Sequence, residues 1–238
     1  MDTLNVLEPL QEDESVIGYD YRNYYPYNTN QIRKSDEIRI PCHNANFVHP
    51  TQSFLYVEGE ITNVLPANST VVKLSKNFVA FLFSEIQLEL NGQVIDSLRN
   101  PGIVTTLKNY ALLSEQDKTR ASEYFWISLV VDFSPTKPYF SCCLPLSMLL
   151  PFCHDYRKVV LFSKMELVLI RSRSDLDCCA DPAKERSADI KLTKVCWRMP
   201  HVTLADLLKL KMSKILESGR EITTGFRAVE YFEYPKVG

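Results

Sequence analysis

The chain has 238 residues, of which 45% are apolar and 24% are charged, so it can bury a sizeable core in one domain. Its formal net charge of −2 excludes the excess of positive charge that drives general binding to nucleic acid, and we expect no direct nucleic-acid partner. No apolar run reaches the roughly 18 residues of a membrane span, and the acidic start lacks the features of a secretory signal. We therefore expect a protein with no membrane span that is not secreted by a signal of its own.

The amino-terminal part predicts a flexible arm followed by short strands. Residues 1–16 are acidic and show no β-pattern, which leaves residues 17–238 for one folded domain. The tyrosine-rich stretch 19–27 contains Pro26, which cannot donate to a ladder, so we expect an edge strand or an extended arm. Stacking of nucleobases on these tyrosines is disfavoured because only Arg22 lies among them. Further strands are expected at 36–40, stopped by Pro41, and at 53–62, with a turn at 63–69.

The central stretch from Asn77 to Leu113 predicts an apolar turn, a β-hairpin and a helix. Apolar and polar residues alternate from Glu85 to Leu90, as in a half-buried strand. Asn91-Gly92 follows, and both residues tolerate the positive φ of a type I′ turn, so residues 93–96 should return as a strand. After Pro101, a helical pattern places four residues on one apolar face: Ile103, Leu107, Tyr110 and Ala111.

The second half of the chain predicts further strands and one more helix. Thr203 and Asp206 resemble a capping box at the start of a helix that extends to Glu217 and closes at Gly219. The remaining predictions are a polar loop at 114–121, strands at 123–132 and 139–144, a buried turn at 144–153, a hairpin of strands 158–162 and 164–172, a charged loop at 175–187 whose charge run 184–186 is solvated, and strands at 190–201 and 226–234.

About nine or ten strands with few and short helices favour an antiparallel β-sandwich over a sheet with regular β-α-β crossovers. A jelly roll tolerates short helices in its connections, and so do other Greek keys. The periodicity alone leaves both open.

No pattern of residues predicts catalysis or metal binding. Lys211 to Lys214 read KMSK, a signature of class I aminoacyl-tRNA synthetases, but the helical spacing of the neighbouring leucines favours a helix surface. Cys153, His154 and Asp155 could suggest a thiol nucleophile, but adjacent side chains on extended chain point to opposite faces. Of the four histidines, at positions 43, 49, 154 and 201, only His43 and His154 directly follow a cysteine, whereas structural zinc ligands favour a spacing of two to four residues. We expect no enzyme, no cofactor and no small-molecule substrate.

The seven cysteines are an odd number, and two adjacent pairs, at 142–143 and 178–179, cannot each close locally without strain. The sequence therefore predicts free thiols and an intracellular protein.

Five stretches in this order resemble one known family: FLYVEGEIT, FVAFLFSEIQLELNGQVIDSLRNPGIVTTLKNY, LPLSMLLPF, MELVLIRSRSDLD and VCWRMPHV. The family is the double jelly-roll-like domain of uncharacterised invertebrate proteins, which are similar to major capsid proteins of double-jelly-roll DNA viruses and related mobile elements. The resemblance covers about residues 19–235 and implies a jelly roll.

The resemblance also implies a function. It suggests a structural capsid module of viral or transposon origin, located in a virion or inside the cell, whose full-length relatives self-associate into trimeric capsomers. Residues 17–238 would be the first module, with the second absent. The alternative is a host interaction module that binds protein or carbohydrate through its loops. Apolar groups on both faces of 226–234 predict an exposed patch and self-association of this chain.

Overall fold

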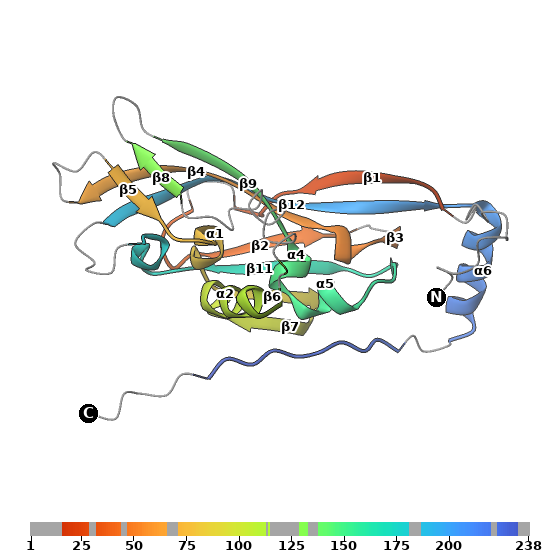
Figure 1. Cartoon of the computed structure of the whole chain (residues 1–238). Coiled ribbons are helices and arrows are strands. Elements are labelled where there is room, and N and C mark those ends of the chain that lie inside the picture. The colour runs from red at the N-terminus through yellow and green to blue at the C-terminus, as the bar shows by residue number, and fades with distance from the viewer. Residues whose placement is uncertain are drawn as a thin grey trace, which may run out of the picture.

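Two antiparallel sheets stacked face to face form the body of the protein (Figure 1). The structure is a computed structural model of the whole chain. It describes residues 16–28, 32–43, 47–65, 71–112, 114, 129–132, 138–180, 187–219 and 223–232.

The first sheet has six strands in the order β10-β3-β12-β4-β9, with β1 pairing β12 beside this path. Its strands are β1 (Val16–Tyr24), β3 (Phe47–Val48), β4 (Phe54–Leu65), β9 (Tyr139–Pro145), β10 (Val160–Leu161) and β12 (Ser187–Leu204). β12 is 18 residues long and pairs β4 with its first part and β1 with its last part. β1 is therefore an edge strand, which is one of the two alternatives predicted for the tyrosine-rich stretch 19–27, and Pro26 lies just beyond its end.

The second sheet has the order β2-β11-β6-β7, and a small third sheet pairs β5 with β8. The strands of these sheets are β2 (Glu37–Cys42), β6 (Phe83–Leu90), β7 (Gln93–Arg99), β11 (Met165–Arg171), β5 (Val71–Leu74) and β8 (Leu129–Asp132). Every ladder between these strands is antiparallel, so the predicted fold class is confirmed among the described residues.

Short helices fill the connections between strands. They are the 3₁₀ helices η1 (Pro50–Gln52) and η3 (Leu176–Cys178), and the α-helices α1 (Phe78–Phe81), α2 (Pro101–Leu112), α4 (Leu146–Leu149), α5 (Pro151–Asp155) and α6 (Asp206–Glu217). α6 lies at the end of the sandwich opposite to β5 and β8 (Figure 1). Gly219, at φ +67°, ends α6 as predicted.

The core lies between the two large sheets because alternate residues of each strand point inward. From β12, Val195, Trp197 and Met199 are fully or almost fully buried, and from β11, Leu167 and Leu169 face them. One contiguous apolar cluster connects the sheets, with a smaller cluster where β3 and the end of β12 meet α6.

The hairpin predicted at mid-chain is present. Asn91 and Gly92 have φ values of 51° and 81°, and Leu90 pairs with Gln93 across the turn. The turn is also anchored to the next segment, since Lys164 N donates to Asn91 Oδ1 at 3.0 Å and the Lys164 carbonyl accepts from Asn91 N at 2.8 Å.

Gly92→Val should destabilise the protein by about 1–2 kcal/mol because a β-branched residue is strained at positive φ. A Cβ at Gly92 would meet no atom within 4 Å, so the loss would come from backbone strain and not from a clash. Urea unfolding followed by circular dichroism measures this loss. An unchanged midpoint would contradict the type I′ assignment.

The expected hairpin of 158–162 and 164–172 is wrong. β10 pairs with β3 in the first sheet, whereas β11 pairs with β2 and β6 in the second. The short link between them crosses from one layer to the other, and Phe162 adopts φ +44° there. Local spacing cannot distinguish such a crossing from a tight turn within one sheet.

Three boundaries also differ from expectation. β2 continues through Pro41, which is tolerated because β2 is an edge strand. The buried turn predicted at 144–153 contains the end of β9 and the helices α4 and α5. Thr203 belongs to β12, and Ala205 stands at the N-cap of α6 with no side-chain hydrogen bond, so the predicted capping box is wrong.

Residues 223–232 are extended but form no strand, so the strand predicted at 226–234 is not found in its described part. This segment returns from α6 along the second sheet, beside β7 (Figure 1). The arm was predicted at 1–16, but Val16 already belongs to β1. Residues 1–15, most of the loop 114–121 and residues 123–128 lie outside the described part of the chain.

Candidate functional site

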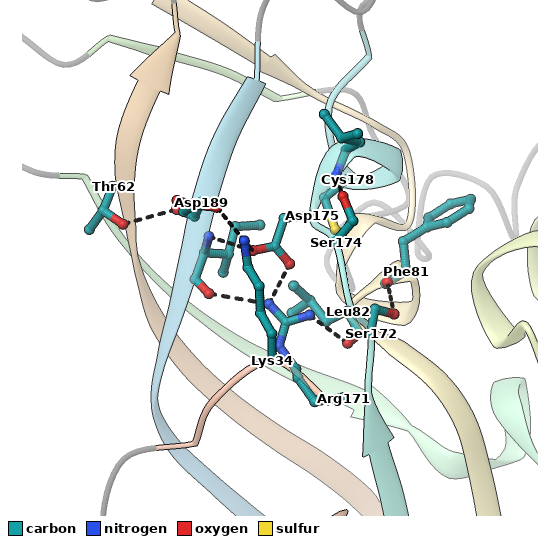
Figure 2. Close-up of polar contacts among 12 residues, drawn as sticks. Lys34, Thr62, Phe81, Leu82, Arg171, Ser172, Ser174, Asp175, Cys178 and Asp189 are labelled. Carbon is teal, nitrogen blue, oxygen red and sulfur yellow. Dashed lines mark hydrogen bonds and ion pairs between the residues drawn. The ribbon is translucent and has the colours of Figure 1, made fainter. Parts of the chain in front are cut away.

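A buried ion-pair network joins the two sheets at one end of the sandwich (Figure 2). Arg171 continues the inward alternation of β11, and its side chain is 1% exposed, as is that of Asp175. The guanidinium pairs with Asp175 and donates to the carbonyl oxygens of Leu82 at 2.7 Å and Ile190 at 3.2 Å. Asp175 also accepts from Ile190 N at 2.9 Å, so β11 and β12 are held together through these charges.

Lys34 closes the network on its solvent side. Its ammonium lies 3.6 Å from Asp175 Oδ2 and forms an ion pair with Asp189 of β12. The pKa of Lys34 is raised, first by its hydrogen bond to Asp189. Asp175 was predicted to begin a charged loop, and the structure buries its side chain in the core. Its charge is matched by protein groups, so the network is a structural connection and offers no reactive group.

A second polar contact holds the carboxy-terminal segment. Asp155, at the end of α5, accepts three hydrogen bonds from Arg227: from the backbone N at 3.1 Å, Nε at 2.8 Å and Nη2 at 2.6 Å. The Arg227 side chain lowers the pKa of Asp155 far below its ordinary value. The adjacent Phe226 ring meets Phe152 edge-on, with centroids 5.2 Å apart. Residues 226 and 227 are thereby fixed against α5.

The possible thiol nucleophile is not assembled. Cys153 is fully buried in α5, and burial raises its pKa far above the ordinary value. Asp155 is engaged by Arg227, and burial lowers the pKa of His154. Contrary to expectation, these three residues lie on a helix and not on extended chain. The described residues contain no group of three or more His, Cys, Asp or Glu side chains that could hold a metal ion.

None of the seven cysteines forms a disulfide, and six of them are buried. Burial raises the pKa of the Cys42 thiol to about 11 and that of Cys142 to about 12. These two thiols are therefore protonated at neutral pH and unreactive.

We predict that a thiol reagent added to the native protein labels one residue quickly, Cys143, which is only half-buried. Denatured protein that was never reduced should titrate seven thiols. Mass spectrometry after labelling distinguishes the thiol that reacts in the native protein from the thiols that react only after denaturation. Three or fewer thiols in the denatured protein would contradict the free-thiol assignment.

Helix α2 carries its apolar stripe on the outside. Ile103, Leu107 and Tyr110 are 39%, 65% and 54% exposed, whereas the polar Thr105 and Asn109 are 1% and 5% exposed. An amphipathic helix ordinarily buries its apolar face. We call the surface formed by Ile103, Leu107 and Tyr110 the α2 stripe; it lies on a helix whose Val104 packs against the main core cluster.

Two contacts explain why α2 has this orientation. A Cβ at Gly102 would lie 2.4 Å from the Phe81 ring, so the helix approaches α1 through a residue without a side chain. Asn77 Nδ2 donates to Thr105 Oγ1 at 2.7 Å, so this hydroxyl on the inner side of α2 has a buried partner. The sequence predicted which residues share the stripe but not that the stripe points to solvent.

The comparisons with known proteins match this geometry. Antiparallel sheets packed as a jelly roll, with short helices in the connections, define the class of protein as a β-sandwich. The model of the double jelly roll-like domain family matches residues 72–238. The chain belongs to this family.

Solved viral capsid proteins share the fold. The Faustovirus major capsid protein superposes with a TM-score of 0.59 at 9% identity, over 88% of this chain and 58% of that one. The cryo-EM structure of the Sputnik virophage gives a TM-score of 0.57 at 10% identity, over 86% of this chain and 51% of that one. PBCV-1 VP54, fitted into a reconstruction of Sputnik, gives a TM-score of 0.56 at 12% identity, over 87% of this chain and 47% of that one.

The chain thus spans about half the length of the capsid chains that it matches. At such identities the likeness establishes the fold. No curated protein sequence gives a significant match. Within the described residues, no helix is both long and apolar enough to span a bilayer.

Proposed function

We propose that this chain is a structural, non-catalytic module of a capsid-like assembly, derived from a virus or a mobile element. It acts by burying the α2 stripe against another jelly-roll module. The single observation that carries the proposal is the inverted orientation of α2, which leaves Ile103 and Leu107 in water on a helix fixed to the core.

Burial of the α2 stripe would be favourable because it removes apolar surface from water. Apolar side chains at 39–65% exposure are stabilised by transfer to a protein interface at about 25 cal/mol for each Å² removed from water. A helix held by Gly102 and by the Asn77–Thr105 hydrogen bond cannot rotate to hide them. A second module that covers the stripe would therefore lower the free energy without rearranging this one.

Family membership supports the choice of a jelly roll as the partner, since the domain is described as double. In the assembled form we expect trimeric capsomers, located in a virion or inside a cell, with no direct contact to nucleic acid. The unreactive thiols of the described core support a role without catalysis.

Sedimentation velocity at rising protein concentration tests the proposal. The chain should self-associate and bind a hydrophobic dye, and Leu107→Glu should shift it toward monomer because it places a charge in the buried interface. Val94→Glu is the matched control, since Val94 is also exposed, at 52%, but lies on β7 outside the stripe.

Both variants should keep the parent's thermal unfolding midpoint, because neither side chain is buried. A parent chain that stays monomeric at every concentration and binds no dye would contradict the proposal. It would favour a self-sufficient interaction module that binds protein or carbohydrate.

A further inference from the structure

A pocket of about 370 Å³ lies where the end of β12 meets β1, β3 and α6. Its lining includes Arg22 from β1, Lys209 and Ser213 from α6, and the rings of Phe47 and Phe162. Arg22 stands opposite the core residue Met199 in the ladder, so its side chain points to the same side of the sheet as the core. The volume lies within the range of small ligand or peptide side-chain sites.

The described lining carries two cations and no carboxylate. The acidic partners of these cations stand outside the pocket. Asp20 lies 3.0 Å from Arg22, with both side chains at least 60% exposed, and Asp206 lies 3.3 Å from Lys209 and is 93% exposed. Such exposed pairs are weak, so either cation can exchange its partner for an anion that enters the pocket.

His201 adds no charge to this pocket. Burial lowers the pKa of its imidazole, which is therefore neutral at neutral pH, and its Nε2 lies 2.7 Å from the Tyr24 hydroxyl. Attraction of an anion thus depends on Arg22 and Lys209.

The rim of the pocket is aromatic. Phe162 is a bulky residue at φ +44°, a conformation that side chains larger than Gly or Asn rarely adopt. This backbone places its ring 51% exposed and edge-on to Phe47, with centroids 5.1 Å apart. A ligand that fits both the two cations and the aromatic rim of the pocket carries carboxylates next to apolar side chains.

The chain itself contains such a segment, residues 1–15, which lies outside the described part. Its sequence MDTLNVLEPLQEDES has five carboxylates, no lysine or arginine, and apolar residues between the acids. It joins the folded part at Val16, which packs on the same small cluster as Phe47 and Leu208 of α6. Since extended chain spans about 3.3 Å per residue, Glu12 can reach roughly 13 Å from Val16.

We propose that the acidic arm, residues 1–15, docks in this pocket of its own chain, with carboxylates of Glu12, Asp13 and Glu14 at Arg22 and Lys209. Apolar side chains of the arm contact Phe47 and Phe162. The short connection through Val16 gives the arm a high effective concentration at the pocket, which favours the chain's own arm over that of a second copy. This inference does not depend on the proposed capsid-like function.

The test uses the full chain and a full-chain variant with a neutralised arm, Glu12→Gln/Asp13→Asn/Glu14→Gln. A fluorescein-labelled peptide of residues 1–15 is titrated into each, and anisotropy is measured. The peptide should bind the neutralised variant at least tenfold more tightly than the parent chain, whose own arm occupies the pocket. Binding should weaken steeply with salt.

Adding Arg22→Ser and Lys209→Ser to the neutralised variant should abolish peptide binding. Lys211→Ser is the matched control and should leave peptide binding unchanged. Lys211 is two positions after Lys209, which is a rotation of about 200° around the helix axis, so its side chain lies on the other flank of α6. Hydrogen exchange of residues 201–213 should be slower in the parent chain than in the neutralised variant.

Three results would overturn the proposal. The first is equal peptide affinity for the parent and the neutralised variant. The second is peptide binding that survives loss of both Arg22 and Lys209. The third is a dimer of the parent that the neutralised variant loses, since this would place the arm in a second copy. Circular dichroism of each variant confirms that it is folded.

Discussion

Arg171→Met is expected to destabilise the protein by about 3–5 kcal/mol, because breaking a buried ion pair leaves an uncompensated charge in the core. The change removes the charge that matches Asp175 and leaves that carboxylate, whose side chain is 1% exposed, beside Lys34 alone at 3.6 Å. The carbonyl oxygens of Leu82 and Ile190 also lose the hydrogen bonds that the guanidinium donates, although Leu82 O still accepts from Ser172 N at 2.9 Å. Urea unfolding of the two proteins measures the difference.

Arg22→Met, made in the chain with the neutralised arm (Glu12→Gln/Asp13→Asn/Glu14→Gln) and compared with that chain, is the matched control, since it breaks an arginine–aspartate pair without removing a contact to the arm. Its two side chains are 60% and 64% exposed, so about 0–1 kcal/mol should be lost. The double variant Arg171→Met/Asp175→Leu should be more stable than Arg171→Met alone, because no unmatched charge remains in the core. Equal losses of stability from Arg171→Met and Arg22→Met, each relative to its own parent chain, would show that the buried network contributes little.

This network shows where inference from sequence ends. Charge predicts a solvated position for Asp175, and charge is a good guide only when no partner is available inside the fold. One signal was present: Arg171 extends the period of two set by Met165, Leu167 and Leu169. The partner groups at Leu82 and Ile190 are distant in sequence and could not be predicted.

Local features were predicted well. The Asn91-Gly92 turn depends on φ preferences of two residues, and α6 depends on spacing within 12 residues. Features set by the packing of layers were missed, such as the crossing between sheets at Phe162 and the outward face of α2. The α2 orientation follows from the contact of Gly102 with Phe81, which belongs to a different helix, and no periodicity reports it.

The second large effect is expected at Gly59 of β4, in the core-facing series of Leu55, Val57 and Ile61. A Cβ at Gly59 would lie 2.7 Å from Phe140 Cε1 and 2.8 Å from the carbonyl oxygen of Lys191. The Phe140 ring has little room to move because it is 5% exposed and packs edge-on against Phe78 at 5.2 Å.

Gly59→Ala should therefore cost about 1–3 kcal/mol, as overpacking of a filled core does. The control is Gly18→Ala on the edge strand β1, where a Cβ meets nothing within 4 Å and the exchange should be neutral or slightly stabilising. Adding Phe140→Leu to Gly59→Ala separates the two clashes. If the ring is the obstacle, the smaller side chain recovers part of the stability, and if the Lys191 carbonyl is the obstacle, it recovers none. Equal urea midpoints for Gly59→Ala and Gly18→Ala would mean that β4 and β9 do not approach each other as closely as the Gly59–Phe140 contact requires.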